Sequence, residues 1–218
     1  MKSLLAGFLL LSFLSHAHSA NSDFIDNGNY TTDTLSGLDW LDLTETQNQS
    51  YDYVSSQFGV GGLYEGWQYA TGTQFLTMVN NWTDTTASTN LSTTNIYTEG
   101  TDSIDGLVQL LGNTYYPNTT NDPNGIMYSY GIIDDVYPTN PSLRYVALLQ
   151  DNNEDIEFNW DTARANQALI NNDAQLGQIG SYLVRTTVPA ATSVPEVNAI
   201  VLFAFGLLSI FGAARRKV

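Results

Sequence analysis

The sequence predicts an α+β domain, with short helices early in the chain and antiparallel strands late. Two patterns predict this fold class. Apolar side chains recur at helical spacing in residues 71–82, whereas the runs 126–133 and 143–149 consist mostly of aliphatic and aromatic residues. A third observation concerns stability: the sequence contains no cysteine. The domain must therefore be held together by a hydrophobic core rather than by disulfides.

Three early segments are predicted to be helical. Residues 51–58 follow Ser50, a residue type that caps helix N-termini, and the glycine-rich stretch 59–62 ends them. Residues 71–82 place four apolar side chains on one face, namely Phe75, Leu76, Val79 and Trp82. Residues 103–111 repeat this pattern, with Ser103 as the cap and inward-facing side chains at Ile104, Leu107, Val108 and Leu111. A later helix is predicted over residues 161–170.

Strands are predicted where aromatic and β-branched residues follow turn signals. The turn at Ser36-Gly37 precedes a short strand that contains Leu38 and Trp40, and the last strand covers residues 181–187. Residues 83–101 are rich in Thr, Ser and Asn, and we expect a loop there. Residues 20–187 together form one acidic domain, long enough to bury a core.

Residues 1–19 have the order of a secretory signal peptide. Lys2 precedes an apolar run over residues 4–14, which is too short to span a bilayer. Small residues follow at Ala17, Ser19 and Ala20. We therefore expect export, with cleavage between Ser19 and Ala20 by signal peptidase, or alternatively after Ala17 or Ala20.

The C-terminal segment has the features of a transmembrane helix. Residues 197–214 are apolar apart from Asn198 and Ser209, and as a helix they would cover about 27 Å, close to the hydrocarbon thickness of about 30 Å. The tail 215–218 is basic, with cations at Arg215, Arg216 and Lys217. Such a cluster stays in the cytoplasm, so the acidic domain, joined through the spacer 188–196, is predicted to lie outside.

The spacer ends in Val194-Pro195-Glu196, and this box, the apolar run and the basic cluster resemble the PEP-CTERM sorting signal. Exosortase-type membrane enzymes of exopolysaccharide-producing Gram-negative bacteria recognise that signal. Val197 stands where the family has a second proline. The resemblance implies that the protein is anchored in the inner membrane before processing. Afterwards it is expected at the cell surface, in the outer envelope or in the extracellular matrix. The tail is either cleaved and replaced by another attachment or retained as a membrane anchor.

Three short segments of the domain resemble a domain type common in PEP-CTERM proteins, which is itself similar to secreted modules of C-type-lectin-like fold. They read Gly-Leu-Asp-Trp-Leu-Asp (37–42), Gly-Trp-Gln-Tyr-Ala-Thr (66–71) and Tyr-Leu-Val-Arg (182–185). Family members usually carry Arg in place of Gln68. The family has no agreed activity, so this resemblance implies a location rather than a mechanism.

The composition of the domain excludes several kinds of chemistry. Every acid except Glu196 lies between residues 20 and 194, against three arginines, for a net charge of −18. This charge repels nucleic acid and anionic polysaccharide. The same region has no His, Cys or Lys, which excludes a Ser-His-Asp triad, a cysteine nucleophile, a usual zinc site and a lysine Schiff base. We expect no enzyme activity; a carboxylate-dependent glycosidase is the catalytic alternative.

Three candidate sites remain. Asp151, Asn153 and Asp155 place side-chain oxygens at every second position, as the start of a calcium-binding loop does. The rest of the EF-hand pattern is absent. They form either a looser Ca²⁺ site or a polar turn. Trp40 and Trp67 are either core anchors or rings that stack on a glycan. Arg144 and Arg185, in predicted strands, are either clamps for an anionic ligand or members of ion pairs, and the ion pairs are favoured.

These observations together predict a non-enzymatic, exported surface or matrix protein, sorted by an exosortase-type enzyme and linked to exopolysaccharide or biofilm. A calcium-assisted carbohydrate-binding module is the alternative, and Ca²⁺ is then the cofactor. The expected partners are the export machinery, the sorting enzyme, exopolysaccharide and, through the C-terminal helix, the membrane; nucleic acid is not expected.

Overall fold

A computed structural model describes residues 23–92, 94–98, 104–115, 126–151 and 160–187. The predicted signal peptide (1–19), the sorting signal (Val194, Pro195, Glu196, Arg215, Arg216 and Lys217) and the predicted transmembrane segment (197–214) lie outside these residues. Among the described residues, no helix is both long and apolar enough to cross a membrane.

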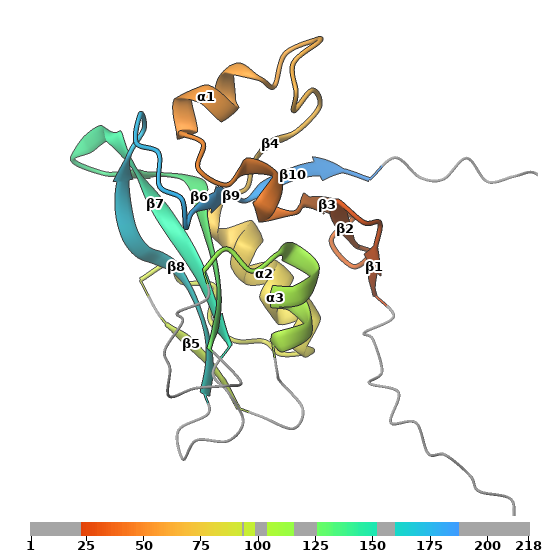
Figure 1. Cartoon of the computed structure of the whole chain (residues 1–218). Coiled ribbons are helices and arrows are strands. Elements are labelled where there is room, and N and C mark those ends of the chain that lie inside the picture. The colour runs from red at the N-terminus through yellow and green to blue at the C-terminus, as the bar shows by residue number, and fades with distance from the viewer. Residues whose placement is uncertain (1–22, 93, 99–103, 116–125, 152–159, 188–218) are drawn as a thin grey trace, which may run out of the picture. The chain divides into compact units, whose positions relative to one another are not determined.

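The described residues form an α+β fold with two sheets (Figure 1). The predicted fold class, α+β, is therefore confirmed. The first sheet has the order β1-β2-β3-β10-β4 and is antiparallel throughout. Its strands are β1 (Phe24–Asp26), β2 (Tyr30–Asp33), β3 (Leu38–Leu41), β4 (Gln68–Tyr69) and β10 (Leu183–Thr186). The expected strand after the Ser36-Gly37 turn is confirmed as β3.

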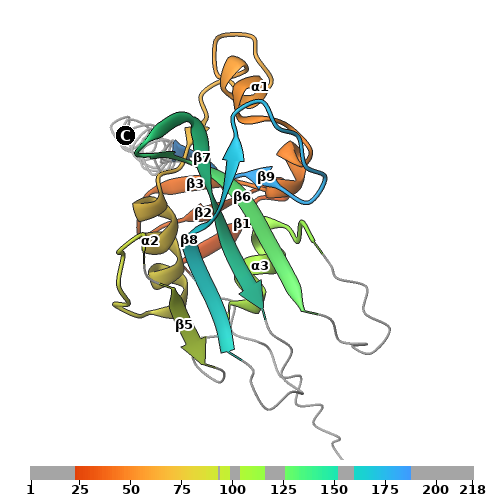
Figure 2. The same cartoon turned by 90° about the vertical axis from the view of Figure 1, so that its left-hand side faces the viewer.

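The second sheet has the order β5-β8-β7-β6-β9, and only the β6–β9 pair is parallel. Its three central strands are long, and β7 and β8 pair along most of their length (Figure 2). Its strands are β5 (Asn95–Thr98), β6 (Met127–Tyr137), β7 (Asn140–Asp151), β8 (Trp160–Asn171) and β9 (Gly180–Ser181).

The three predicted early helices are confirmed, and the apolar faces expected for the second and third of them are buried, with Trp82 only partly so. They are α1 (Tyr51–Ser56), α2 (Gly72–Thr83) and α3 (Asp105–Leu111), and a 3₁₀ turn, η1 (Leu43–Thr46), precedes them. The Ser50 hydroxyl accepts a hydrogen bond from the Tyr53 amide at 3.2 Å. Thr71 and Gln74 form a reciprocal capping box at the start of α2. Ser103, the expected cap of α3, lies outside the described residues.

Three secondary-structure predictions were wrong. Residues 161–170 form most of β8 rather than a helix, because pairing with β7 and β5 outweighs the helix propensity of Ala, Arg and Gln. The buried Ala163 and Ala165 are small enough to let α2 pack against this strand. The expected loop 83–101 contains β5, and strands occur early in the chain as well as late.

The core lies between the sheets and the helices α2 and α3. One cluster of buried side chains unites both sheets with these helices, including Trp40, Leu43, Phe75, Leu149 and Tyr182. A second cluster gathers beside α1, including Leu41, Val54, Ile132 and Leu183. Aromatic residues thus supply much of the packing in a chain without disulfides.

The surroundings of Gly131 show how tightly this core is packed. A Cβ at Gly131 would lie 2.5 Å from the fully buried Tyr182 ring and 2.7 Å from Leu43. Because buried rings cannot shift without a cavity beside them, Gly131→Ala is expected to lower the free energy of unfolding by about 1–3 kcal/mol. Urea denaturation would measure this. Gly177→Ala is the control, since nothing lies within 4 Å of its added methyl group; an equal effect of both would contradict the packing.

Candidate functional site

A cluster of carboxylates brings together residues that are far apart in the sequence. Asp105 begins α3, Asp151 ends β7 and Asp161 lies near the start of β8, and one oxygen of each lies within 4.8 Å of the others. Asp151 is 6% exposed and Asp161 2% exposed. The Ile104 amide donates a hydrogen bond to Asp161 Oδ2 at 2.9 Å, which joins the start of α3 to β8.

Carboxylate oxygens are the ligands that Ca²⁺ prefers, and buried carboxylates are costly unless they are paired or hydrogen-bonded. The cluster therefore offers three of the six to eight oxygen ligands that a calcium ion takes. Of the predicted ligands, Asp151 belongs to it, whereas Asn153 and Asp155 lie outside the described residues. The sequence reasoning missed Asp105 and Asp161, because no local spacing links α3 to the start of β8.

Arg185 forms an ion pair, which the sequence analysis favours over a role as a clamp for an anionic ligand. Its Nε donates to Asp39 Oδ2 at 2.9 Å, across the β10–β3 pair in which the two residues are direct partners. The guanidinium also lies over two aromatic rings, 4.4 Å from the Trp67 centroid and 4.6 Å from that of Tyr30. Cation–π contacts of this kind add to the ion pair, so Arg185 is engaged in holding the first sheet together.

The two tryptophans proposed as glycan contacts are core residues. Trp40 is 1% exposed and packs edge-on against Tyr182. Trp67 is 9% exposed and is covered by Arg185. Neither indole offers an open ring face on which a sugar could stack, so the structure supports the core-anchor interpretation of both.

Arg144 contacts aromatic and backbone groups near a surface pocket. Its guanidinium lies 4.3 Å from the Tyr51 ring centroid, and Nη1 donates to the Pro141 carbonyl at 3.3 Å. The Tyr51 ring also stacks on the ring of Tyr69, with the two centroids 4.3 Å apart. Burial raises the pKa of Tyr51, and the hydrogen bond that its hydroxyl donates to Asp134 at 2.7 Å raises this pKa further.

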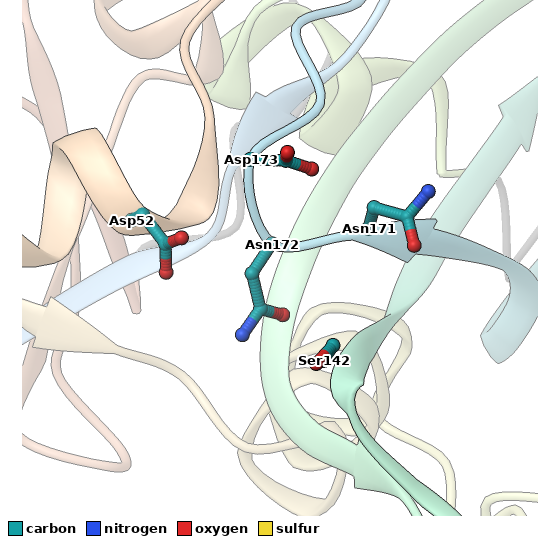
Figure 3. Close-up of a pocket in the computed structure, with 5 residues that line it drawn as sticks. All are labelled: Asp52, Ser142, Asn171, Asn172 and Asp173. Carbon is teal, nitrogen blue, oxygen red and sulfur yellow. The ribbon is translucent and has the colours of Figure 1, made fainter.

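The pocket beside this group has a volume of about 450 Å³ and a polar wall. Figure 3 shows its lining, which comes from α1, the start of β7, the end of β8 and the turn that follows: Asp52, Ser142, Asn171, Asn172 and Asp173. Two backbone hydrogen bonds hold these segments together. The Asp52 amide donates to the Asn172 carbonyl at 3.0 Å, and the Asn172 amide donates to the Ser142 carbonyl at 2.9 Å.

Comparison of the chain with protein-family models, curated proteins and solved structures found no match.

Asp42, between β3 and η1, has an unusual carboxyl group. Its Oδ1 is buried and has no hydrogen-bond partner among the described residues. Burial raises the pKa of Asp42 from 3.8 to about 6, and the neighbouring charges of Asp26 and Glu45 contribute to the increase. A raised pKa means that the folded protein holds this proton more tightly than the unfolded chain does. The group therefore favours folding at low pH, and its contribution is lost as the pH rises through about 6.

Asp42→Asn is expected to raise the free energy of unfolding by about 1–2 kcal/mol at pH 7.5, a value reduced for solvent screening of this partly exposed group. The gain should vanish near pH 4, where the native carboxyl is protonated. Urea denaturation at both pH values would measure it. Asp173→Asn, on an exposed turn, is the control. A gain that is equal at both pH values would contradict this account of Asp42.

Proposed function

We propose that this chain is an exported, non-enzymatic surface or matrix protein, sorted by an exosortase-type enzyme and associated with exopolysaccharide. One observation carries the proposal: a Val-Pro-Glu box, an apolar run and a basic cluster follow the last strand in the order of a sorting signal. The N-terminal signal-peptide pattern agrees with export.

The chemistry of the domain supports this location. A surface rich in carboxylates and poor in cations favours solubility outside the cell and has little affinity for nucleic acid. The core depends on buried aromatic and aliphatic groups rather than on disulfides or free thiols. Such a domain is insensitive to the redox state of its surroundings, because it has no thiol to oxidise.

Expression in an exosortase-containing Gram-negative host tests the proposal. We expect the intact mass of the surface-extracted protein to lack the signal peptide and the residues from about Pro195 onward. We also expect the extracted protein to sediment with the host's exopolysaccharide. A mass that ends at Val218 indicates instead that the helix is retained as an anchor. Full-length protein in the cytoplasm with an intact N-terminus contradicts export.

The sorting box offers a matched pair of variants. Pro195→Ala removes the feature that the resemblance identifies, and we expect it to leave the C-terminal segment attached. Val197→Ala changes a position that already departs from the family pattern, so its processing should equal that of the parent chain.

Calcium-assisted carbohydrate binding is a second candidate function, and the cluster of Asp105, Asp151 and Asp161 favours it. Ca²⁺ bound only by the folded state would stabilise it by mass action. Millimolar Ca²⁺ is therefore expected to raise the melting temperature by a few degrees, and Asp161→Asn should abolish the rise. Asp173→Asn, outside the cluster, should retain it. No response to Ca²⁺ in the parent protein contradicts this function.

A further inference from the structure

We propose that the loop between α1 and β4 (residues 57–67) docks on a lipid bilayer through the side chains of Val60 and Leu63. Val60 is 97% exposed and Leu63 is 70% exposed, the two highest values among the exposed large apolar side chains of the described residues. The inference rests on the proposed function, because it takes the apolar run 197–214 to lie in the membrane before processing. It adds a second membrane contact, made by the folded domain itself.

Hydrogen bonds within the loop hold its shape. The Tyr64 amide donates to the Gln57 carbonyl at 3.1 Å and closes the base of the loop. The Gly61 amide donates to the Glu65 carboxylate at 2.8 Å. Tyr64 is 7% exposed and belongs to the core cluster beside α1, so it anchors the loop. A loop that is ordered before it docks loses less conformational entropy on docking.

The exposure of Val60 and Leu63 differs from that of apolar residues scattered singly over a surface, which needs no explanation. The two side chains are three positions apart on one loop, and the positions between and before them, 59, 61 and 62, are glycines. In water their apolar area stays hydrated. The boundary between lipid headgroups and acyl chains removes such area from water, so it stabilises the loop where water does not.

Strand pairing places this loop beside the end of β10, from which the chain continues to the C-terminal segment. β4 begins at Gln68, directly after the loop, and pairs antiparallel with β10, with Val184 opposite Gln68. The residues before Gln68 therefore lie beside the residues after Val184. The contact of Arg185 with the Trp67 ring, 4.4 Å from its centroid, shows this directly. The loop and the end of β10 thus share one edge of the first sheet (Figure 1).

The chain lengths allow both membrane contacts at once. Seven residues separate Val60 from Trp67, and they span at most about 25 Å. Ten residues separate Thr187 from the start of the apolar run at Val197, and they span up to about 36 Å. A bilayer that holds the apolar run can therefore also contact Val60. Because the tether gives the loop an effective concentration on the order of millimolar at the membrane, a contact too weak for a free protein becomes populated.

Charge selects the kind of membrane surface. Glu65 lies in the loop, and residues 20–194 carry a net charge of −18. A leaflet rich in anionic lipid repels such a domain. The contact is therefore apolar rather than electrostatic, and zwitterionic headgroups favour it. Added salt screens the repulsion from anionic lipid.

Spin labelling of the full-length protein in phosphatidylcholine vesicles tests the inference. Because the chain has no cysteine, Val60→Cys and Leu63→Cys each give one site for a nitroxide label. Quenching by oxygen and by a water-soluble nickel complex reports whether a label lies in lipid or in water. We expect both labels to lie in lipid. Val60→Ala, combined with the label at 63, should lower the ratio of docked to free signal about tenfold, since it removes two carbons from lipid contact.

Val136→Cys is the matched control. Val136 is 41% exposed and lies beside the β6–β7 turn, which Figure 1 shows far from the end of β10. Its label should stay in water, which excludes an attraction of the nitroxide itself to lipid. A label at Ser209→Cys, in the apolar run, should report lipid. Phosphatidylglycerol in the vesicles should release the labels at 60 and 63 from lipid, and salt should reverse the release.

Three results overturn the inference while the Ser209 label reports lipid. The labels at 60 and 63 are as accessible to nickel as the Val136 label, or they enter lipid only when phosphatidylglycerol is present. Alternatively, they stay in water and broaden each other's spectra between molecules, which indicates docking on a second copy of the chain. In these cases the sorting proposal stands. A Ser209 label in water shows that the tail does not enter the bilayer, and then the proposed function fails as well.

Discussion

Tyr182 packs its ring over Gly131, and this contact joins the two sheets. The ring also contacts Phe75 and Trp40, while its hydroxyl donates to the Ser129 carbonyl at 3.1 Å. Its amide donates to Ile132 in the second sheet, and its carbonyl accepts from Ala70 beside the first. Full burial raises the pKa of Tyr182 well above its ordinary value, so the phenol stays neutral. Tyr182 thus contacts strands of both sheets and helix α2.

The two polar regions lie at opposite ends of the β7–β8 pair. Asp151 and Asp161 are at the end where β7 finishes, whereas Ser142 and Asn171 are at the other end. At about 3.3 Å per residue, the strand between Ser142 and Asp151 spans about 30 Å. The two regions are therefore well separated along the sheet.

Two of the domain's three arginines lie against aromatic rings. Arg185 lies between Asp39 and two aromatic rings, and Arg144 lies over Tyr51. Aromatic faces accommodate the weakly hydrated guanidinium well. Because these arginines are used in packing, they neutralise little of the surface charge. The surface therefore stays acidic.

Local sequence determined the elements whose signals are local: the Ser50 and Thr71 caps, the buried faces of α2 and α3, and the α+β class. Tertiary structure decided the rest. Residues 161–170 became a strand because hydrogen bonding to two neighbours outweighed helix propensity. The carboxylate cluster and the pocket each combine residues from distant segments. Only the pairing of β7 with β8 and the docking of α1 and α3 bring them together, and no spacing in the sequence encodes such long-range contacts.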